Sequence, residues 1–428
     1  MPATNRELPT EVPAGSLVLA GSVGSALEWF DFAVYGYLAP VMGKLFFPNA
    51  DAIAVLLSVF AVFSVGHILR PAGAVLLGHI GDRYGRKRML LLGVSTMGLA
   101  SGGIALLPTF AQAGIWAPIL LVVLRALQGL SVGGEYTGAM AYTAECAPLP
   151  RRGFFTSLVT VGSLVGMAAG SAVAALLQYG LDEKDLLSWG WRVPFAAGVV
   201  IAALGALMRM NMHESVAFKR ADKVEEAASA WKAVRLHWGL MLRIVALVSG
   251  ANIAFFTGFV YLPDALAQRM PAQAGVIAGI TAAVLMVQAM FVVLGGWLSD
   301  RFGRRRISFI FRFVTLAVAV PAMRYGVDGT IVGMVIAQLL FTVPVGVITG
   351  LQGALVSELS PSDHRCSVVS ISFGTAIAVF AGNAPLIAAW MIGRKGWVDG
   401  PAIYIMVMVA ISLVVMSLSK PVRPTDMK

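Results

Sequence analysis

The sequence predicts an all-α membrane protein whose twelve transmembrane helices form two homologous six-helix bundles. Three observations predict this fold class: the composition, the spacing of the apolar runs and an internal repeat. Hydrophobic residues make up 58% of the 428 residues and charged residues only 13%, whereas soluble domains average about 45–50% apolar and about 25% charged residues. So few charges cannot cover such an apolar chain in water, which excludes a disordered chain, a disulfide-rich secreted domain and an ordinary soluble enzyme.

Apolar runs long enough to cross a bilayer, about 20 residues each, recur along the whole chain. They predict spans at 17–39, 53–77, 89–108, 117–144, 154–178 and 191–211, and again at 241–263, 274–295, 307–326, 329–357, 367–393 and 400–419. Residues 212–240, between the sixth and the seventh run, carry both positive and negative charges and are expected to form an amphipathic connector on the membrane surface. The predicted organisation is a tail (1–16), a bundle (17–211), the connector (212–240), a second bundle (241–419) and a tail (420–428).

An even number of spans places both termini on one side of the membrane. If that side is the cytoplasm, the cytoplasmic loops hold most of the Lys and Arg residues, as the positive-inside rule requires. The formal charge of +10 therefore indicates membrane topology and no nucleic-acid partner. Two cysteines, Cys146 and Cys366, are too few for a disulfide framework or a metal site, so we expect no cofactor and no metal.

Two motifs occur twice at matched positions. Residues 78–88 read GHIGDRYGRKR and residues 296–306 read GWLSDRFGRRR, each after the second span of its half. The pattern E-x2-P-x3-R follows span four, starting at Glu145, and span ten, starting at Glu358. Matched motifs at matched positions indicate two homologous halves. Parallel halves around an axis along the membrane normal are a known transporter plan, with the substrate site between them.

The repeated G-x3-D-R-x-G-R loop resembles the signature of the major facilitator superfamily. Four further strings resemble its metabolite:proton symporter family, which includes ketoglutarate, proline/betaine, shikimate and citrate permeases. They are LEWFDFAVYG (27–36), LRPAG (69–73), RALQGLSVGGEYTGA (125–139) and WGWRVPF (189–195). The resemblance covers nearly every span. It implies the major facilitator fold and co-transport of a small organic acid or zwitterion with protons by alternating access.

Ionisable residues inside spans usually face a cavity or a partner, and the first span carries Glu28 and Asp31. With Tyr35, a candidate substrate contact, they occupy one helical face. A carboxylate whose partner comes and goes can load and release a proton, because burial and a nearby Arg move its pKa in opposite directions. We expect this role for Asp31; a static ion pair is the alternative, and for Glu28 the two readings are balanced.

The fourth span presents Arg125, Gln128, Ser131 and Glu135 on one face. Arg125 resembles the fourth-helix arginine that the superfamily associates with proton coupling, and we expect it to pair with Asp31 in one state. Gln128 is a candidate substrate contact. Glu135 is either a second carboxylate of the relay or a structural partner.

Arg70, in the second span, is a candidate ligand for a substrate carboxylate because its guanidinium presents a bidentate fork. It could instead snorkel to the surface or pair with Glu28, and Pro71 beside it predicts a kink. Substrate contacts predicted by position alone in the second half are Asn252, Phe256, Tyr261 and Gln288.

The remaining charged and polar residues of the spans have simpler expected roles. We expect Arg209 and Arg312 to snorkel and the five histidines, His67, His79, His213, His237 and His364, to lie mostly at membrane edges. Asn383 and Pro385 indicate a break in span eleven. Gly162, Gly166 and Gly170 recur every fourth residue in span five, which favours close helix packing.

By resemblance to the superfamily, the repeated loops latch the cytoplasmic side. The predicted gating residues are Asp82, Arg83, Arg86, Glu145, Arg152, Asp300, Arg301, Arg304, Glu358 and Arg365. We expect Glu145 to face Arg83 and Glu358 to face Arg301. The alternative is that these charges only set the topology.

The leading interpretation is proton-coupled uptake of a small organic acid such as a di- or tricarboxylate. The chain ends shortly after the last span, without the coiled coil of the osmosensing proline/betaine members, and this favours an organic acid. Import of a zwitterion such as betaine or proline, and metabolite export or exchange, are the alternatives; a transport-derived sensor belongs to another class. We expect a monomer that is not an enzyme and that lies in the plasma membrane, the inner membrane of a bacterium, with both termini in the cytoplasm.

Overall fold

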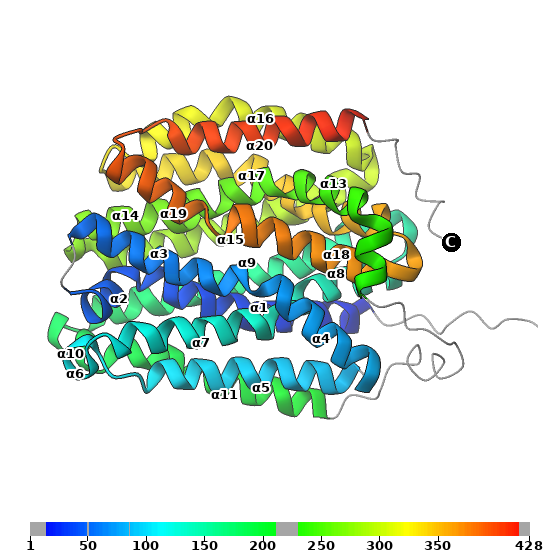
Figure 1. Ribbon diagram of the computed structural model, residues 1–428. Coiled ribbons are helices and arrows are strands. Elements are labelled where there is room, and N and C mark those ends of the chain that lie inside the picture. The colour runs from blue at the N-terminus through cyan, green and yellow to red at the C-terminus, as the bar shows by residue number, and fades with distance from the viewer. Residues whose placement is uncertain (1–13, 49–50, 85, 211–229, 419–428) are drawn as a thin grey trace, which may run out of the picture.

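The twelve predicted spans are present as helices that run side by side in two bundles (Figure 1). The computed structural model describes residues 14–48, 51–84, 86–210 and 230–418. Ten of the described helices are each long and apolar enough to cross a bilayer, and α1 and α5 complete the twelve. The fold class predicted from the sequence is confirmed.

The first half contains α1 to α11. Its spans are α1 (Ala14–Tyr37), α3 (Ala52–Ile68) with α4 (Arg70–Tyr84), α5 (Arg86–Ala105), α7 (Trp116–Val132) with α8 (Glu135–Cys146), α9 (Arg152–Gly180) and α11 (Val193–Met210). Short helices α2 (Ala39–Phe46), α6 (Phe110–Ala113) and α10 (Glu183–Ser188) lie in its connections.

The second half contains α13 to α20. Its spans are α13 (Ala230–Phe256) with α14 (Leu262–Arg269), α15 (Ala274–Phe302), α16 (Arg304–Gly326), α17 (Ile331–Leu359), α18 (Arg365–Ala376) with α19 (Ala384–Ala389), and α20 (Gly400–Leu418). The helix of span seven begins before the expected start at 241 and contains a non-helical residue, His237. Most of the predicted connector, residues 211–229, lies outside the described residues.

The sequence explains where several helices begin and end. Asp51 caps α3 by accepting hydrogen bonds from the backbone N–H groups of Ile53 and Ala54, which otherwise lack partners at a helix start. Gly303 separates α15 from α16 with φ 90°, a left-handed conformation that glycine adopts without strain. The second repeated loop therefore turns at Gly303.

Small residues bring α9 against α1. A Cβ atom at Gly162 or Gly166 would collide with the backbone of Ser22 or Ala26, so the helices approach at backbone distance, as the glycine spacing predicts. On its other side α9 packs on α15 of the second half, and the two run together through the centre of the molecule (Figure 1).

Four spans are interrupted within their length. Span two breaks at Leu69 and span four at Gly133 and Gly134. Spans seven and eleven contain π-helical turns, Thr257–Tyr261 and Ile377–Ala381. Interrupted helices expose backbone groups and commonly surround transporter binding sites. The predicted kink near Pro71 and the predicted break near Asn383 are both confirmed.

Candidate functional site

The first-span carboxylate Asp31 and the fourth-span Arg125 are joined through an amide. Arg125 Nη1 donates to Gln128 Oε1 at 2.7 Å, and Gln128 Nε2 donates to Asp31 Oδ2. Ser101 donates to Asp31 Oδ1 at 2.7 Å. The direct distance from Arg125 Nη1 to Asp31 Oδ2 is 3.9 Å. Asp31 and Arg125 therefore lie together as expected, and Gln128 belongs to their network.

Aromatic rings enclose Arg125. Its guanidinium carbon lies 4.6 Å from the ring centre of Phe32 and 4.4 Å from that of Tyr35, and the residue is 0% exposed. Tyr35 donates its hydroxyl hydrogen to the carbonyl oxygen of Val59. The ring of Tyr35 thus stabilises the Arg125 cation through a cation–π contact. Its hydroxyl is hydrogen-bonded to the backbone and is not directed toward a substrate.

The second buried ion pair joins Arg70 to Glu28. Arg70 Nη2 lies 2.9 Å from Glu28 Oε1, and both side chains are almost wholly buried. Of the three readings for Arg70, pairing with Glu28 is the one observed. Arg70 begins α4 directly after the break in span two, and it also lies over the rings of Trp29 and Phe32, 5.3 and 4.6 Å from their centres. A carboxylate ligand would therefore compete with Glu28 for this guanidinium.

An aromatic cluster connects the two halves beside this pair. We call it the interface cluster: Trp29, Phe63, His67 and Tyr136 from the first half, and Phe256 and Phe373 from the second. Trp29 lies 6.0 Å from Phe256, His67 lies 5.3 Å from Phe256, and Tyr136 lies 5.5 Å from Phe373, measured between ring centres. Aromatic faces attract organic cations, quaternary ammonium groups especially.

Sequence reasoning missed most of the interface cluster. It proposed Phe256 but singled out neither Trp29 nor His67. His67 is 0% exposed, with its Nδ1 3.1 Å from the carbonyl oxygen of Phe63. The signal was present, because Trp29 and Tyr136 lie inside two of the four strings that carried the family resemblance.

The other candidates of the second half are buried but lie in different surroundings. Asn252 donates to the carbonyl oxygen of Val248 and to Gln352 Oε1. Tyr261 packs with Phe60 across the halves, 6.2 Å between ring centres. Neither amide atom of Gln288 has a hydrogen-bond partner among the described residues.

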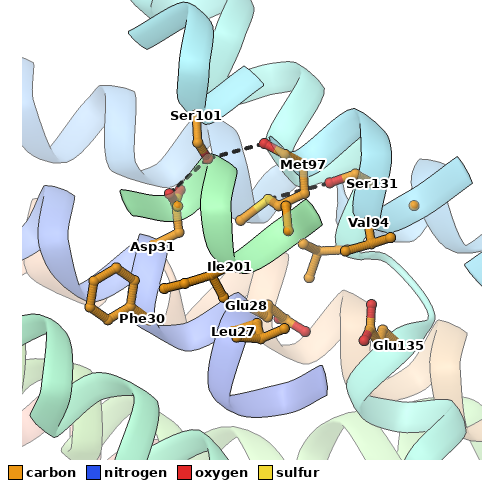
Figure 2. Close-up of a pocket in the computed structure, with 14 residues that line it drawn as sticks. Leu27, Glu28, Phe30, Asp31, Val94, Met97, Ser101, Ser131, Glu135 and Ile201 are labelled. Carbon is orange, nitrogen blue, oxygen red and sulfur yellow. Dashed lines mark hydrogen bonds between the residues drawn. The ribbon is translucent and has the colours of Figure 1, made fainter. Parts of the chain in front are cut away.

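A second region of interest lies wholly inside the first half. Glu28, Asp31, Ser101, Ser131 and Glu135 line a cavity of about 30 Å³ between α1, α5, α7, α8 and α11 (Figure 2). The sequence placed Ser131 and Glu135 on the face of span four that carries Arg125. The structure brings both to the same cavity as the two first-span carboxylates.

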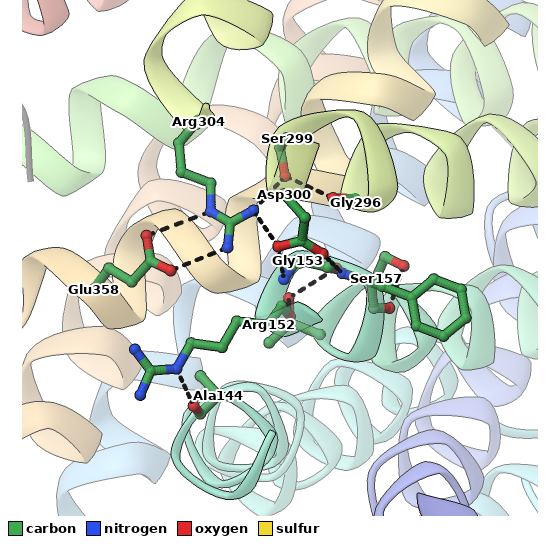
Figure 3. Close-up of polar contacts among 11 residues, drawn as sticks. Ala144, Arg152, Gly153, Ser157, Gly296, Ser299, Asp300, Arg304 and Glu358 are labelled. Atoms are coloured by element: carbon green, nitrogen blue, oxygen red, sulfur yellow. Dashed lines mark hydrogen bonds and ion pairs between the residues drawn. The ribbon is translucent and has the colours of Figure 1, made fainter. Parts of the chain in front are cut away.

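At one end of the bundle, here called the motif end, residues of the second repeated loop contact the first half (Figure 3). Asp300 accepts hydrogen bonds from the backbone N–H groups of Gly153 and Phe154, both at 2.8 Å, at the start of α9. Arg304 holds Asp300 at 2.6 Å and Glu358 at 3.1 Å. The loop therefore caps a helix of the opposite half, which is a contact that must break if this end opens.

The expected pairing of Glu358 with Arg301 at the motif end was wrong. Glu358 pairs with Arg304 and not with Arg301, whose guanidinium lies over the rings of Trp297 and Phe302. Arg301 lies in the last turn of α15. Arg304 begins α16 after the turn at Gly303, and its guanidinium contacts Glu358.

Glu145 pairs across the halves with Arg365 at 2.9 Å, and its expected pairing with Arg83 stays a prediction. Arg152 and Arg365 each donate through Nε to the carbonyl oxygen eight residues earlier, Ala144 and Ser357. This shared geometry is what the repeated E-x2-P-x3-R pattern encodes. The side chains of Asp82, Arg83 and Arg86 lie outside those that the structure describes.

At the opposite end the halves also touch. Tyr37 donates to the carbonyl oxygen of Phe259 at 2.7 Å, and Asp51 pairs with Arg394 at 2.9 Å. The backbone N–H of Ala54 and the guanidinium of Arg394 hold the pKa of the Asp51 carboxyl below its usual range. Contacts at both ends leave the interface cluster enclosed between them.

Two buried charges differ from the sequence reading. Arg312 was expected to snorkel but is 2% exposed and donates to Ser412 Oγ and to the carbonyl oxygen of Leu247, both at 2.7 Å. Asp264, just beyond the predicted end of span seven, is buried in α14 and was missed. The side chain of Arg209 lies outside the described set.

Comparison with known proteins agrees with this architecture. A family model described as "Sugar (and other) transporter" matches residues 17–235, and one described as "Major Facilitator Superfamily" matches residues 270–428. A solved proton:xylose symporter superimposes with a TM-score of 0.76 at 18% identity, covering 94% of each chain. This protein belongs to the major facilitator superfamily of membrane transporters.

Within that superfamily its relatives are those of the metabolite:proton symporter family that the motifs resemble. The proline/betaine transporter of Salmonella typhimurium is 34% identical over 93% of this chain and 81% of its own length. The shikimate transporter of Escherichia coli is 34% identical over 87% of each chain. A glycine betaine, proline, ectoine and pipecolic acid transporter of Dickeya dadantii is 33% identical over 92% of this chain and 81% of its own. These names favour the zwitterion alternative over a di- or tricarboxylate.

Proposed function

We propose that this protein is a proton-coupled symporter that imports a zwitterion of the glycine betaine and proline class. The observation that carries the proposal is the position of Arg70. Its guanidinium lies between Glu28, 2.9 Å away, and the ring of Trp29, 5.3 Å away. Trp29 in turn contacts Phe256 of the other half. One cation therefore adjoins an aromatic surface that both halves share.

The two ends of a zwitterion match the two parts of this site. Arg70 pairs with the substrate carboxylate through a charge-assisted, bidentate contact. The rings of Trp29, Phe256 and Tyr136 receive the quaternary or secondary ammonium group, an interaction of about 0.5–2 kcal/mol for each well-placed ring. Because the rings come from both halves, substrate binding favours the state in which the halves close around it.

A di- or tricarboxylate fits this site less well. A second carboxylate requires a second cation, and burying one unpaired costs several kcal/mol. Arg125 is the nearest further guanidinium, but Gln128 and the rings of Phe32 and Tyr35 already occupy its surroundings. A cyclic monocarboxylate, the class named by the shikimate relative, needs only Arg70 and is the second candidate.

Proton coupling is proposed at the first-span carboxylates. Protonation of Asp31 removes the charge that holds Gln128 and Arg125, which loosens α1 from α7. Protonation of Glu28 frees Arg70 for the substrate carboxylate. A substrate therefore binds best to the protonated protein, and deprotonation of Glu28 returns Arg70 to its buried partner and releases the substrate. Competition between Glu28 and the substrate carboxylate for Arg70 therefore couples proton binding to substrate binding.

The remaining proposals concern topology. The motif end faces the cytoplasm and the opposite end faces outward, in the inner membrane of a bacterium. Asp300, Arg304, Glu358, Glu145 and Arg365 form the inner gate, with Arg152 supporting it. Residues 17–211 and 241–419 move as two bodies joined by the 212–240 connector, and the monomer is the transporting unit.

The test is uptake into proteoliposomes that contain the purified protein. Labelled glycine betaine, proline, shikimate, a dicarboxylate and a tricarboxylate are each offered with and without an inward proton gradient. The proposal predicts gradient-driven accumulation of betaine or proline, with little uptake of the multivalent acids. Accumulation of a dicarboxylate in preference to both zwitterions would refute the substrate class, and uptake that ignores the gradient would refute symport.

A further inference from the structure

The cavity in the first half lies apart from the interface between the halves. Its volume, about 30 Å³, leaves room for about two water molecules. All of its lining residues belong to the first half. They are Leu27, Glu28, Phe30 and Asp31 of α1, Gly93, Val94, Met97 and Ser101 of α5, Ser131 and Val132 of α7, Glu135 of α8, and Gly198, Ile201 and Ala202 of α11. The rings that we assign to the substrate lie on the other side of α1.

The two carboxylates at the ends of the cavity differ in their hydrogen bonds: one has donors among the described residues, and the other has an oxygen without one. At one end the Asp31 carboxylate accepts hydrogen bonds from Ser101 and Gln128. At the other, Glu28 is 3% exposed, and no described residue donates a hydrogen bond to its Oε2. A buried carboxylate oxygen in a cavity of this size is normally satisfied by water.

Glu135 lies across the cavity from Glu28. Figure 2 shows the carboxyl of Glu28 directed toward the side on which Glu135 lies, and the two are close enough for their charges to interact. Glu135 is the first residue of α8, directly after the break at Gly133 and Gly134. The free N–H groups of a first helical turn favour a negative charge there.

The cavity is elongated along the helices. Its α5 residues run from Ser101 near Asp31 to Gly93, eight residues or about 12 Å along the axis. From Glu135, α8 continues to Glu145 at the motif end. Glu28 thus has Arg70 on the side of the interface and Glu135 on the side of the cavity, with Asp31 one turn away along α1.

We propose that this cavity is the route by which the coupled proton leaves the transporter, separate from the path of the substrate, with Glu135 as the exit carboxylate. A proton on Asp31 or Glu28 passes through cavity water to the Glu135 carboxylate. Glu28 becomes a carboxylate and recovers Arg70, while Glu135 becomes a carboxylic acid. Glu135 then gives the proton to water on the motif side. The inference rests on the proposed proton symport.

The test compares two kinds of transport by the purified protein in proteoliposomes. Net uptake of glycine betaine driven by a proton gradient requires proton release, whereas betaine exchange at equal internal and external concentrations does not. Glu135→Gln is expected to slow net uptake at least about tenfold, equivalent to about 1.4 kcal/mol, and to leave the exchange rate within about twofold. Glu183→Gln removes an exposed carboxylate paired with Lys44 and serves as the matched control, with both rates unchanged.

A second variant tests the cavity without altering a carboxylate. Ala202→Leu adds an apolar side chain to the lining and is expected to slow net uptake while exchange continues. Normal net uptake in Glu135→Gln, or loss of exchange in a folded Glu135→Gln, overturns the proposal. If Glu135→Gln does not fold, Ala202→Leu decides: slow net uptake with normal exchange supports the route and normal net uptake overturns it. A wild type without any gradient response instead refutes the symport on which the inference rests.

Discussion

Arg125 reaches Asp31 through the side chain of Gln128. The guanidinium donates to the amide oxygen at 2.7 Å, the amide nitrogen donates to the carboxylate, and the direct separation of the charges is 3.9 Å. An amide cannot follow a change of protonation by ionising, so loss of the Asp31 charge weakens the charge-assisted hydrogen bond that holds Gln128 in place. The relationship makes Gln128 the connection between the proposed proton site and span four.

Arg70→Lys is expected to weaken substrate binding with little effect on folding. Lysine keeps the positive charge beside Glu28 but loses the bidentate fork. One lost charge-assisted hydrogen bond is worth about 1.5–3 kcal/mol, so the Km for betaine should rise about 10- to 100-fold. Concentration-dependent uptake measures this. Arg192→Lys, at the opposite end where Arg192 donates to the carbonyl oxygen of Leu107, is the matched control. An unchanged Km in Arg70→Lys would show that Arg70 does not contact the substrate.

Gly153→Ala is expected to hold the motif end open. A Cβ atom there would lie 2.5 Å from the carbonyl oxygen of Gly296 and 2.6 Å from Arg304 Nη1, so α9 and α15 cannot close. The two native cysteines, Cys146 and Cys366, directly follow Glu145 and Arg365 of the gate and report on it. Their modification by a maleimide should be faster in the variant.

Gly180→Ala is the matched control for this gate variant because a Cβ at the far end of the same helix meets no atom within 4 Å. Its cysteines should react as in the wild type. Equal modification rates in Gly153→Ala and Gly180→Ala would contradict the proposed gate.

The Asp51–Arg394 contact at the opposite end is expected to be insensitive to physiological pH. Because hydrogen bonds from Ala54 and Arg394 lower the pKa of Asp51 from its ordinary 3.8, its contribution is fully present above that value. It is lost only as the pH falls through the lowered pKa. Asp51→Asn should therefore change the transport rate by the same factor throughout the range from about pH 5 to pH 8. An effect that disappears toward pH 5 would mean that this contact titrates with the transported proton.

Arg312→Met is expected to reduce stability while leaving transport by the folded protein intact. Methionine fills the space of the stem but removes the donor to Ser412 Oγ, and it leaves the carbonyl oxygen of Leu247 with only the bond from Ser412 at 3.2 Å. The loss of a buried donor costs about 1–3 kcal/mol. Thermal unfolding in detergent measures the loss, with the exposed Arg306→Met as control. A variant with normal thermal stability and no transport would instead assign Arg312 to the transport cycle.

The sequence predicted the spans and the repeat because lipid-facing helices must be apolar for about 20 residues, a pattern that needs no tertiary information. It also predicted that Arg125 would meet Asp31 and that Gln128 would share a face with Arg125, but it assigned Gln128 to the substrate and not to the link between them. Pairings across the motif end could not be predicted in the same way. Arg301 and Arg304 are three residues apart in the chain, and the turn at Gly303 between them directs Arg304 to Glu358.

The burial of Arg312 and the contacts of His67 and Trp29 could not be predicted from position in the chain alone. Arg312 lies near the end of a span, where snorkelling is common, but α13 and α20 cover it with Leu247 and Ser412. Trp29 and His67 lie in spans one and two, and both contact Phe256 of the other half only when the halves dock. Contacts between halves depend on how the bundles dock, which no single helix encodes.

The measurement that tests the account most directly is the movement of protons caused by the substrate. Glycine betaine is added outside proteoliposomes that hold a pH-sensitive dye, with no gradient imposed at the start. Symport predicts that betaine entry acidifies the lumen in the wild type and that Asp31→Asn admits betaine without acidification. Betaine entry into wild-type vesicles with no change in lumenal pH would contradict proton coupling and leave a facilitator.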